Sequence, residues 1–168
     1  LKDFGMQFYT VSDSYIAHLK GVEARVPDNY GGSRAFVGIV LEINGLKYLA
    51  PLTSHKPKQD RIPSSAPSAF KLHERTDPTN KLGMICLNNM LPVTDDVIEL
   101  LDISAQPARY QRMLYKQYEY IKVNITEIES RAQNLYKIVT VDQNKFFTSI
   151  CCDFKVLEEA CNSFNRPT

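Results

Sequence analysis

The chain has 168 residues, 43% of them hydrophobic, and a formal net charge of +1 at pH 7. This length and apolar fraction predict one globular domain over residues 1–168, and the near-neutral charge gives no overall signal for nucleic-acid binding, although basic groups can still gather on one surface. No apolar run reaches the roughly 18 residues that cross a bilayer and the N-terminus lacks a signal-peptide pattern, so we expect a cytoplasmic protein without membrane contact.

The N-terminal part begins with a short β-rich run and one helix. Gln7–Val11 is expected to form a strand, and Asp13–Lys20 a helix, because a serine that can cap the helix precedes it and a glycine follows it. The stretch Val26–Ser33, rich in proline, asparagine and glycine, predicts a loop. This loop would bring Tyr30 next to Arg34.

Two apolar runs on either side of Asn44 and Gly45 predict a β-hairpin. Asn-Gly is a strong signal for a type I′ turn, because both central residues of that turn need positive φ. A two-residue turn fixes the register of the strands, which pairs Ile43 with Leu46, Leu41 with Tyr48, Ile39 with Ala50, and Val37 with Leu52. These pairs make one apolar face, so we expect the hairpin to lie in the core.

The same register gathers polar groups at the open end of the hairpin, where Phe36 falls opposite Thr53. One guanidinium, two hydroxyls, one imidazole and one ammonium converge there, from Arg34, Thr53, Ser54, His55 and Lys56. Donors that suit a phosphate, without a carboxylate among them, favour an anion-binding site. A solvated polar strand end is the alternative.

Loops and short apolar runs alternate after the hairpin. Lys56–Ser68, with its prolines and serines, predicts a long exposed loop that carries Lys58 and Arg61. Strands are expected at Ala69–Leu72, Met84–Leu87 and Leu91–Val93, with a turn-rich connection over Arg75–Lys81. The acidic tract Asp95–Asp102 would repel an anionic ligand, so we expect it to pack on the sheet away from the site.

A long helix is predicted from Pro107 to Val139, because apolar residues recur there in alternating steps of four and three. Its first turns interleave basic and aromatic side chains, a mixture typical of single-stranded RNA binding: Arg109, Tyr110, Arg112, Tyr115 and Lys116. A solvated helix face is the alternative. A strand over Phe146–Ile150 and a helix from Asp153 complete the predicted elements.

The four cysteines do not have the spacing of paired metal ligands. They are Cys86, Cys151, Cys152 and Cys161, and adjacent cysteines make a poor disulfide framework. We therefore expect reduced and mostly buried thiols, and neither a metal site nor a cofactor.

Five segments, in the right order over most of the chain, resemble the ToxN/AbiQ family of toxins from type III toxin–antitoxin systems: Phe8–Ser12, Phe36–Ile43, Lys47–Ser54, Phe70–Glu74 and Arg112–Gln117. The resemblance implies an α+β fold, with a compact, highly curved antiparallel sheet like the MazF/Kid barrel and a long helix and further helices packed on it. It also implies an endoribonuclease that a small repeat-derived pseudoknot RNA inhibits, and a role in growth inhibition and phage defence by abortive infection.

The functional positions of the family correspond here to Tyr30, Arg34, Thr53, Ser54 and Lys56, with Arg34 standing where ToxN has a lysine. RNA carries its own nucleophile, the 2′-OH, so cleavage needs in-line positioning and charge stabilisation but no metal. Arg34 cannot act as a base at neutral pH, so we assign it to the charge of the phosphorane. Thr53 and Ser54 would hold the 2′-OH and phosphate oxygens, and Lys56 would act near the leaving group. The expected products carry a 2′,3′-cyclic phosphate and a 5′-OH.

Further RNA contacts are expected from His55, Lys58, Arg61, Lys71, Arg109, Arg112, Tyr115 and Lys116. Strand alternation turns His55 away from Ser54, so it ranks below the other candidates as a proton carrier. The expected partners are the antitoxin RNA, in a closed protein–RNA assembly, and cellular RNA substrates, but no DNA. Two other functions stay open: a non-catalytic toxin of related fold that acts on a protein target such as a topoisomerase, and a purely RNA-binding module.

Overall fold

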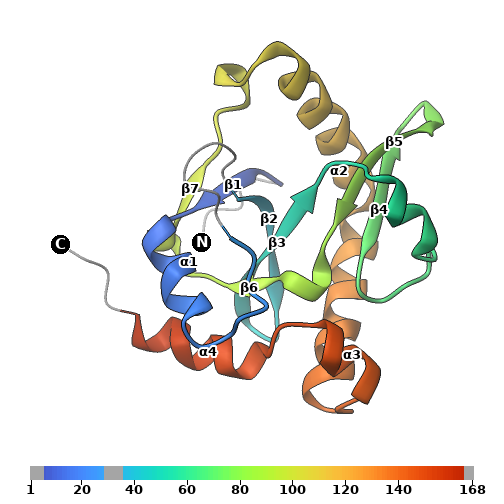
Figure 1. Cartoon of the computed structure of the whole chain (residues 1–168). Coiled ribbons are helices and arrows are strands. Elements are labelled where there is room, and N and C mark those ends of the chain that lie inside the picture. The colour runs from blue at the N-terminus through green and yellow to red at the C-terminus, as the bar shows by residue number, and fades with distance from the viewer. Residues whose placement is uncertain (1–5, 29–35, 165–168) are drawn as a thin grey trace.

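A computed structural model describes residues 6–28 and 36–164 of the chain (Figure 1). Its strands form an antiparallel sheet in the order β4-β5-β3-β2-β1-β7, with β6 paired to β3 beside this path. The strands are β1 (Phe8–Val11), β2 (Val37–Ile43), β3 (Leu46–Thr53), β4 (Phe70–Glu74), β5 (Asp77–Ile85), β6 (Leu91–Pro92) and β7 (Ile98–Leu100). In the described residues β4 and β7 do not pair with each other, so the sheet is open, whereas the resemblance implied a barrel.

Helices pack around this sheet, as the α+β prediction requires. They are α1 (Asp13–Lys20), α2 (Ala108–Thr140), α3 (Lys145–Ile150) and α4 (Phe154–Ser163), and short 3₁₀ turns include η2 (Pro57–Arg61) and η3 (Leu87–Asn89). The long α2 contacts β4 and β2, while α1 and α4 lie side by side at the other end of the sheet (Figure 1). The buried apolar side chains form one contiguous core. None of the helices in the described part of the chain is long and apolar enough to span a membrane.

The predicted hairpin is confirmed in its turn and in most of its register. Asn44 and Gly45 have φ of 53° and 77°, as a type I′ turn requires. Six pairs run in the predicted register from Gly38 with Pro51 to Ile43 with Leu46. The predicted pairing of Val37 with Leu52, and of Phe36 with Thr53, does not form in this ladder. Beyond Pro51, β3 is paired on its other edge, where Leu52 and Thr53 meet β5.

The long helix and α1 are confirmed, with α2 starting one residue after the predicted Pro107. Two predictions are wrong, one about a connection and one about a strand. Most of Arg75–Lys81 belongs to β5, which starts at Asp77 and pairs with β4. The first residues of this strand are polar and exposed, so their sequence resembles that of a turn. Phe146–Ile150 lies in helix α3 and not in a strand, because the Asn144 side chain accepts a hydrogen bond from the Phe147 amide at 3.1 Å and caps a helix there.

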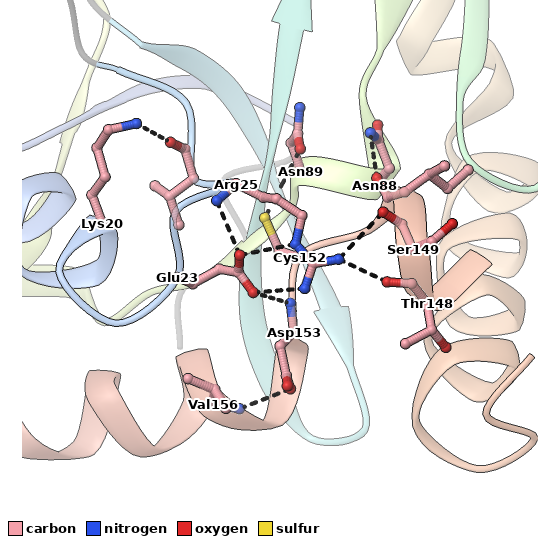
Figure 2. A network of polar contacts seen from close by, with 12 residues as sticks. Lys20, Glu23, Arg25, Asn88, Asn89, Thr148, Ser149, Cys152, Asp153 and Val156 are labelled. Atoms are coloured by element: carbon pink, nitrogen blue, oxygen red, sulfur yellow. Dashed lines mark hydrogen bonds and ion pairs between the residues drawn. The ribbon is translucent and has the colours of Figure 1, made fainter. Parts of the chain in front are cut away.

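A buried carboxylate joins the segment after α1 to the start of α4 (Figure 2). Glu23 is 8% exposed, and its two oxygens accept hydrogen bonds from the Arg25 guanidinium at 2.9 Å each. It also accepts one from the Asp153 amide at 2.9 Å, and Arg25 donates to the Thr148 carbonyl at 2.7 Å. The hydrogen bonds from Arg25 lower the pKa of Glu23 to about 2, despite its burial. This cluster, Glu23, Arg25 and Asp153, is called the Glu23 clamp below.

Glu23→Gln is expected to lower the free energy of unfolding at pH 7 by about 2 kcal/mol, because the charge that Arg25 stabilises is removed. The folded-state pKa lies below the ordinary value of 4.5, so this stabilisation is complete above pH 4.5 and is lost as the pH falls toward 2. Urea unfolding of both proteins at pH 7 and pH 3 measures it. The gap should be smaller at pH 3, and Glu159→Gln, on the exposed side of α4, should leave stability unchanged.

Candidate functional site

A cavity of about 570 Å³ lies at the open end of the central hairpin. One part of its lining is the end of β3 and the turn η2 that follows it, and another part is the first turns of α2. The remaining sides are the start of β2, the end of β5 and η3. The described residues that line the cavity are 27–28, 36–37, 51–54, 56, 58–59, 61–62, 84, 86, 89, 110, 113–114 and 117. Segments that are far apart in the sequence therefore build one site.

Five of the predicted site residues line this cavity together: Thr53, Ser54, Lys56, Lys58 and Arg61. Tyr30 and Arg34 lie outside the described residues. The chain enters and leaves that stretch at Asp28 and Phe36, which both line the cavity. Among the described lining residues three are cationic and only Asp28 is a carboxylate. This balance favours an anionic ligand.

The backbone at Thr53 and Ser54 is held by a close crossing with β5. Gly83 has φ of +110° and lies at a register shift between β4 and β5. A Cβ at Gly83 would lie 1.8 Å from the Thr53 carbonyl oxygen and 2.9 Å from the Ser54 Cα. Only glycine allows β5 to pass this close, so Gly83 sets where the two hydroxyl residues lie.

A buried glutamine fixes the same segment from the other side. Gln59 in η2 is 4% exposed, and its Nε2 donates to the Ser54 carbonyl at 2.9 Å. The Thr53 hydroxyl donates to the same carbonyl at 3.4 Å. No described residue forms a hydrogen bond with the Ser54 hydroxyl, so it is available to a ligand in the cavity.

His55 is not among the described lining residues of the cavity. Its Nε2 lies 3.1 Å from Asp60 Oδ1, and the Lys81 ammonium donates to the same oxygen at 2.9 Å. The hydrogen bonds from Lys81 and His55 hold the pKa of Asp60 below its usual value. His55 is thus engaged in a surface cluster beside the cavity, on the side that strand alternation predicts.

The first turns of α2 place the remaining predicted RNA contacts around the cavity. Tyr110, Met113 and Gln117 line it, whereas Arg109, Arg112, Tyr115 and Lys116 are exposed and Lys71 is half-buried on β4. By helical spacing Arg109 and Lys116 lie on the Met113 side of α2, whereas Arg112 and Tyr115 do not. Lys116 forms an ion pair with Glu74 at 2.7 Å. None of these four residues, nor Lys71, is among the described lining residues of the cavity.

The structure adds lining residues that the sequence pattern did not indicate, notably Gln59, Cys86 and Asn89. Burial raises the pKa of the Cys86 thiol to about 11, although Lys56 and Lys58 act in the opposite direction, so the thiol is neutral. All four cysteines are free, and Cys151 and Cys152 are buried. No group of three His, Cys, Asp or Glu side chains in the described ranges is placed to hold a metal ion.

Comparisons with known proteins agree on one family. Residues 7–162 match the family described as "Toxin ToxN, type III toxin-antitoxin system". The chain is 42% identical to the endoribonuclease ToxN of Pectobacterium atrosepticum over 96% of this chain and 95% of that protein.

Two solved structures resemble this fold, each covering 94% of this chain and 96% of the other. One, a type III toxin described as selectively inhibited by a non-coding RNA pseudoknot, has a TM-score of 0.83 and 30% identity. The other is AbiQ, described as a lactococcal anti-phage endoribonuclease, with a TM-score of 0.84 and 28% identity.

Gly83→Ala is expected to lower the free energy of unfolding by roughly 3 kcal/mol or more, because the new Cβ would collide with the backbone at Thr53. Gly45→Ala is the matched control. Gly45 also has positive φ, at +77°, but a Cβ there meets no atom within 4 Å in the described structure, so about 1 kcal/mol is expected. Urea unfolding compares the two variants, and equal losses would show that the crossing is not a constraint.

Proposed function

This chain belongs to the ToxN family of type III toxin–antitoxin systems and is an endoribonuclease, and we propose that it cuts RNA in the cavity at the end of β3. One observation carries the assignment of the site. Two hydroxyl residues, Thr53 and Ser54, line the same cavity as Lys56, Lys58 and Arg61. This is a set of donors and positive charges that suits a phosphodiester.

The proposed reaction begins with attack of the RNA 2′-OH on the adjacent phosphorus, and the bond to the 5′-oxygen of the next nucleotide breaks. Ser54, whose hydroxyl is free of other described residues, donates to a non-bridging oxygen or positions the 2′-OH. The Lys56 ammonium stabilises the charge on the leaving oxygen. Arg34, assigned from the family resemblance, would hold the non-bridging oxygens. The fixed geometry of Thr53 and Ser54 supports in-line positioning of the reacting groups.

The cations that line the cavity supply the charge stabilisation that this reaction needs, so no step of the proposed reaction uses a metal ion. The neutral Cys86 thiol has no part in it either. Two alternatives are a toxin that acts on a protein such as a topoisomerase and a module that only binds RNA. Neither explains why the chain resembles endoribonucleases, or why hydroxyl and cationic side chains gather in one cavity.

We propose a repeat-derived pseudoknot RNA as the natural inhibitor, because a structurally similar toxin is inhibited by a non-coding RNA pseudoknot. We propose that the bound RNA extends from the cavity along α2 toward Arg109, which is exposed and lies one turn before Met113 on the same side of the helix, and toward the exposed Arg112. An inhibitor that contacts more than one copy of the toxin would close into a ring with it. We also propose that this chain inhibits growth and defends against phage by abortive infection, because AbiQ is described as an anti-phage endoribonuclease.

We propose that residues 1–168 form one toxin domain, because the described residues share a single contiguous core. We also propose that the open sheet is related to the barrel of the MazF/Kid toxins. The antiparallel pairing around a central hairpin, with a long helix packed across it, supports this relation.

Ser54→Ala and Lys56→Ala are expected to lower the rate of RNA cleavage by about 10²-fold or more, because each removes a group that stabilises the reacting phosphate. Arg34→Ala should behave in the same way. Ser130→Ala and Lys122→Ala, two exposed positions of α2 outside the cavity, are the matched controls. Cleavage of a labelled RNA by the purified proteins measures the effect, with thermal melting to show that they are folded. Folded Ser54→Ala and Lys56→Ala proteins with normal rates would refute the site.

The cleavage products are expected to carry a 2′,3′-cyclic phosphate and a 5′-OH, and cleavage should persist in EDTA. Both follow from internal attack by the 2′-OH. A substrate with a single 2′-deoxy nucleotide at the cut site should resist cleavage, while the same substitution one nucleotide further along should be tolerated. Mass spectrometry of the fragments identifies the ends. Products with 5′-phosphates, or cleavage of the 2′-deoxy substrate, would contradict the mechanism.

A further inference from the structure

The cavity has a second wall that the cleavage reaction does not use. Besides the cations, the uncharged side chains of Met84, Cys86, Asn89 and Met113 line the cavity. The volume of about 570 Å³ is in the range of pockets that hold small organic ligands, roughly 300–1,000 Å³, and exceeds what a phosphate needs. An uncharged wall beside a phosphate site suits a nucleobase.

Three carboxamides line the cavity, and two of them are engaged. Gln59 donates to the Ser54 carbonyl, and Gln117, which is 1% exposed, donates to the Leu82 carbonyl at 2.8 Å. Asn89 differs from both. Within the described ranges its side-chain NH₂ donates to no residue, and its Oδ1 faces only the weak thiol donor of Cys152, at 3.9 Å (Figure 2). Asn89 therefore has a donor and an acceptor to offer a ligand.

The turn that carries Asn89 is held rigidly. The Asn89 amide donates to the Cys86 carbonyl at 3.1 Å, and the Asn88 amide to the Ser68 carbonyl at 3.0 Å. The Asn88 side chain donates to the Ile150 carbonyl at 3.2 Å, and its own carbonyl accepts from the Cys152 amide at 3.0 Å. A side chain on a fixed turn can discriminate between ligands, because little freedom is lost on binding.

The turn also lies next to the proposed reaction site. The Cys86 amide donates to the Pro51 carbonyl at 2.8 Å, two residues before Thr53 on β3. Cys86 is close enough to Lys56 and Lys58 for their charges to act on its thiol. A base held by Asn89 therefore belongs to a nucleotide that flanks the phosphate being cut.

We propose that Asn89 selects the base of this flanking nucleotide by hydrogen bonds to its edge. A carboxamide presents a donor and an acceptor side by side, and single-stranded RNA exposes base edges to such groups. On the Watson–Crick edge, adenine and cytosine present an amino donor followed by a ring-nitrogen acceptor, and guanine presents an acceptor followed by donors. Uracil has an acceptor on each side of its N3–H donor and so presents both orders. A carboxamide of fixed orientation, facing a base of fixed orientation, therefore discriminates guanine from adenine and cytosine. This inference rests on the proposed function, since it assumes that RNA is cut in this cavity.

Asn89→Asp tests the inference, because it keeps the shape of the side chain and replaces the NH₂ donor with an acceptor. At a position next to the cut, the wild-type protein should discriminate guanine from adenine and cytosine when it cuts a random RNA pool. In Asn89→Asp that preference should fall roughly tenfold, which is the discrimination a bidentate contact supplies, while preferences at other positions stay the same. Asn89→Ala separates loss of the donor from the added charge. Sequencing of the fragment ends gives the preference.

Asn134→Asp, an exposed position of α2 outside the cavity, is the matched control and should cut like the wild type. If the Asn89 variants fold but cut too slowly to sequence, competition binding of four short RNAs is measured instead. These carry a 2′-deoxy nucleotide at the cut site and differ only in the flanking base. An unchanged base preference in Asn89→Asp and Asn89→Ala, or no preference in the wild type, would overturn the inference. A wild-type protein that cuts no RNA would refute the proposed function instead.

Discussion

The passage of β5 beneath Thr53 and Ser54 is the constraint on which the site depends. The β2–β3 ladder ends at Gly38 and Pro51, and β5 pairs with Leu52 and Thr53 on the other edge of β3. The cavity lies at this end of the hairpin and is lined by the start of β2 and the ends of β3 and β5. Gly83 has no Cβ, and this allows β5 to approach the backbone of Thr53 and Ser54 and to fix its position.

The sheet and the helix α2 divide the work of the site between them. The strand end and η2 carry the hydroxyls and the positive charges, whereas α2 contributes Tyr110 and Met113 to the lining. The buried Gln59 joins the strand end to η2, and the buried Gln117 joins α2 to β5. The hydroxyl and cationic side chains that line the cavity can therefore remain accessible while the backbone that carries them is fixed from within the protein.

The sequence predicted what local chemistry decides. Asn44 and Gly45 set the turn and therefore the pairing, and the apolar spacing in α2 set its buried face. The prediction of a strand at Phe146–Ile150 was wrong. It followed the residue composition of this segment and did not consider that Asn144 can cap a helix. Asn89 could not have been predicted as a lining residue, because its place depends on contacts with residues near 68 and 150. Such long-range contacts leave no pattern in the nearby sequence.

The Glu23 clamp has a consequence for how this protein is made. The ribosome releases Glu23 early, but the Asp153 amide and the Thr148 carbonyl that complete the clamp emerge only near the end of synthesis. The α2 wall of the cavity also follows the strand end by more than fifty positions in the chain. A nascent chain that already displays Thr53 and Ser54 thus has neither the α2 wall of the cavity nor the clamp, so the complete cavity forms only after nearly the whole chain has been made.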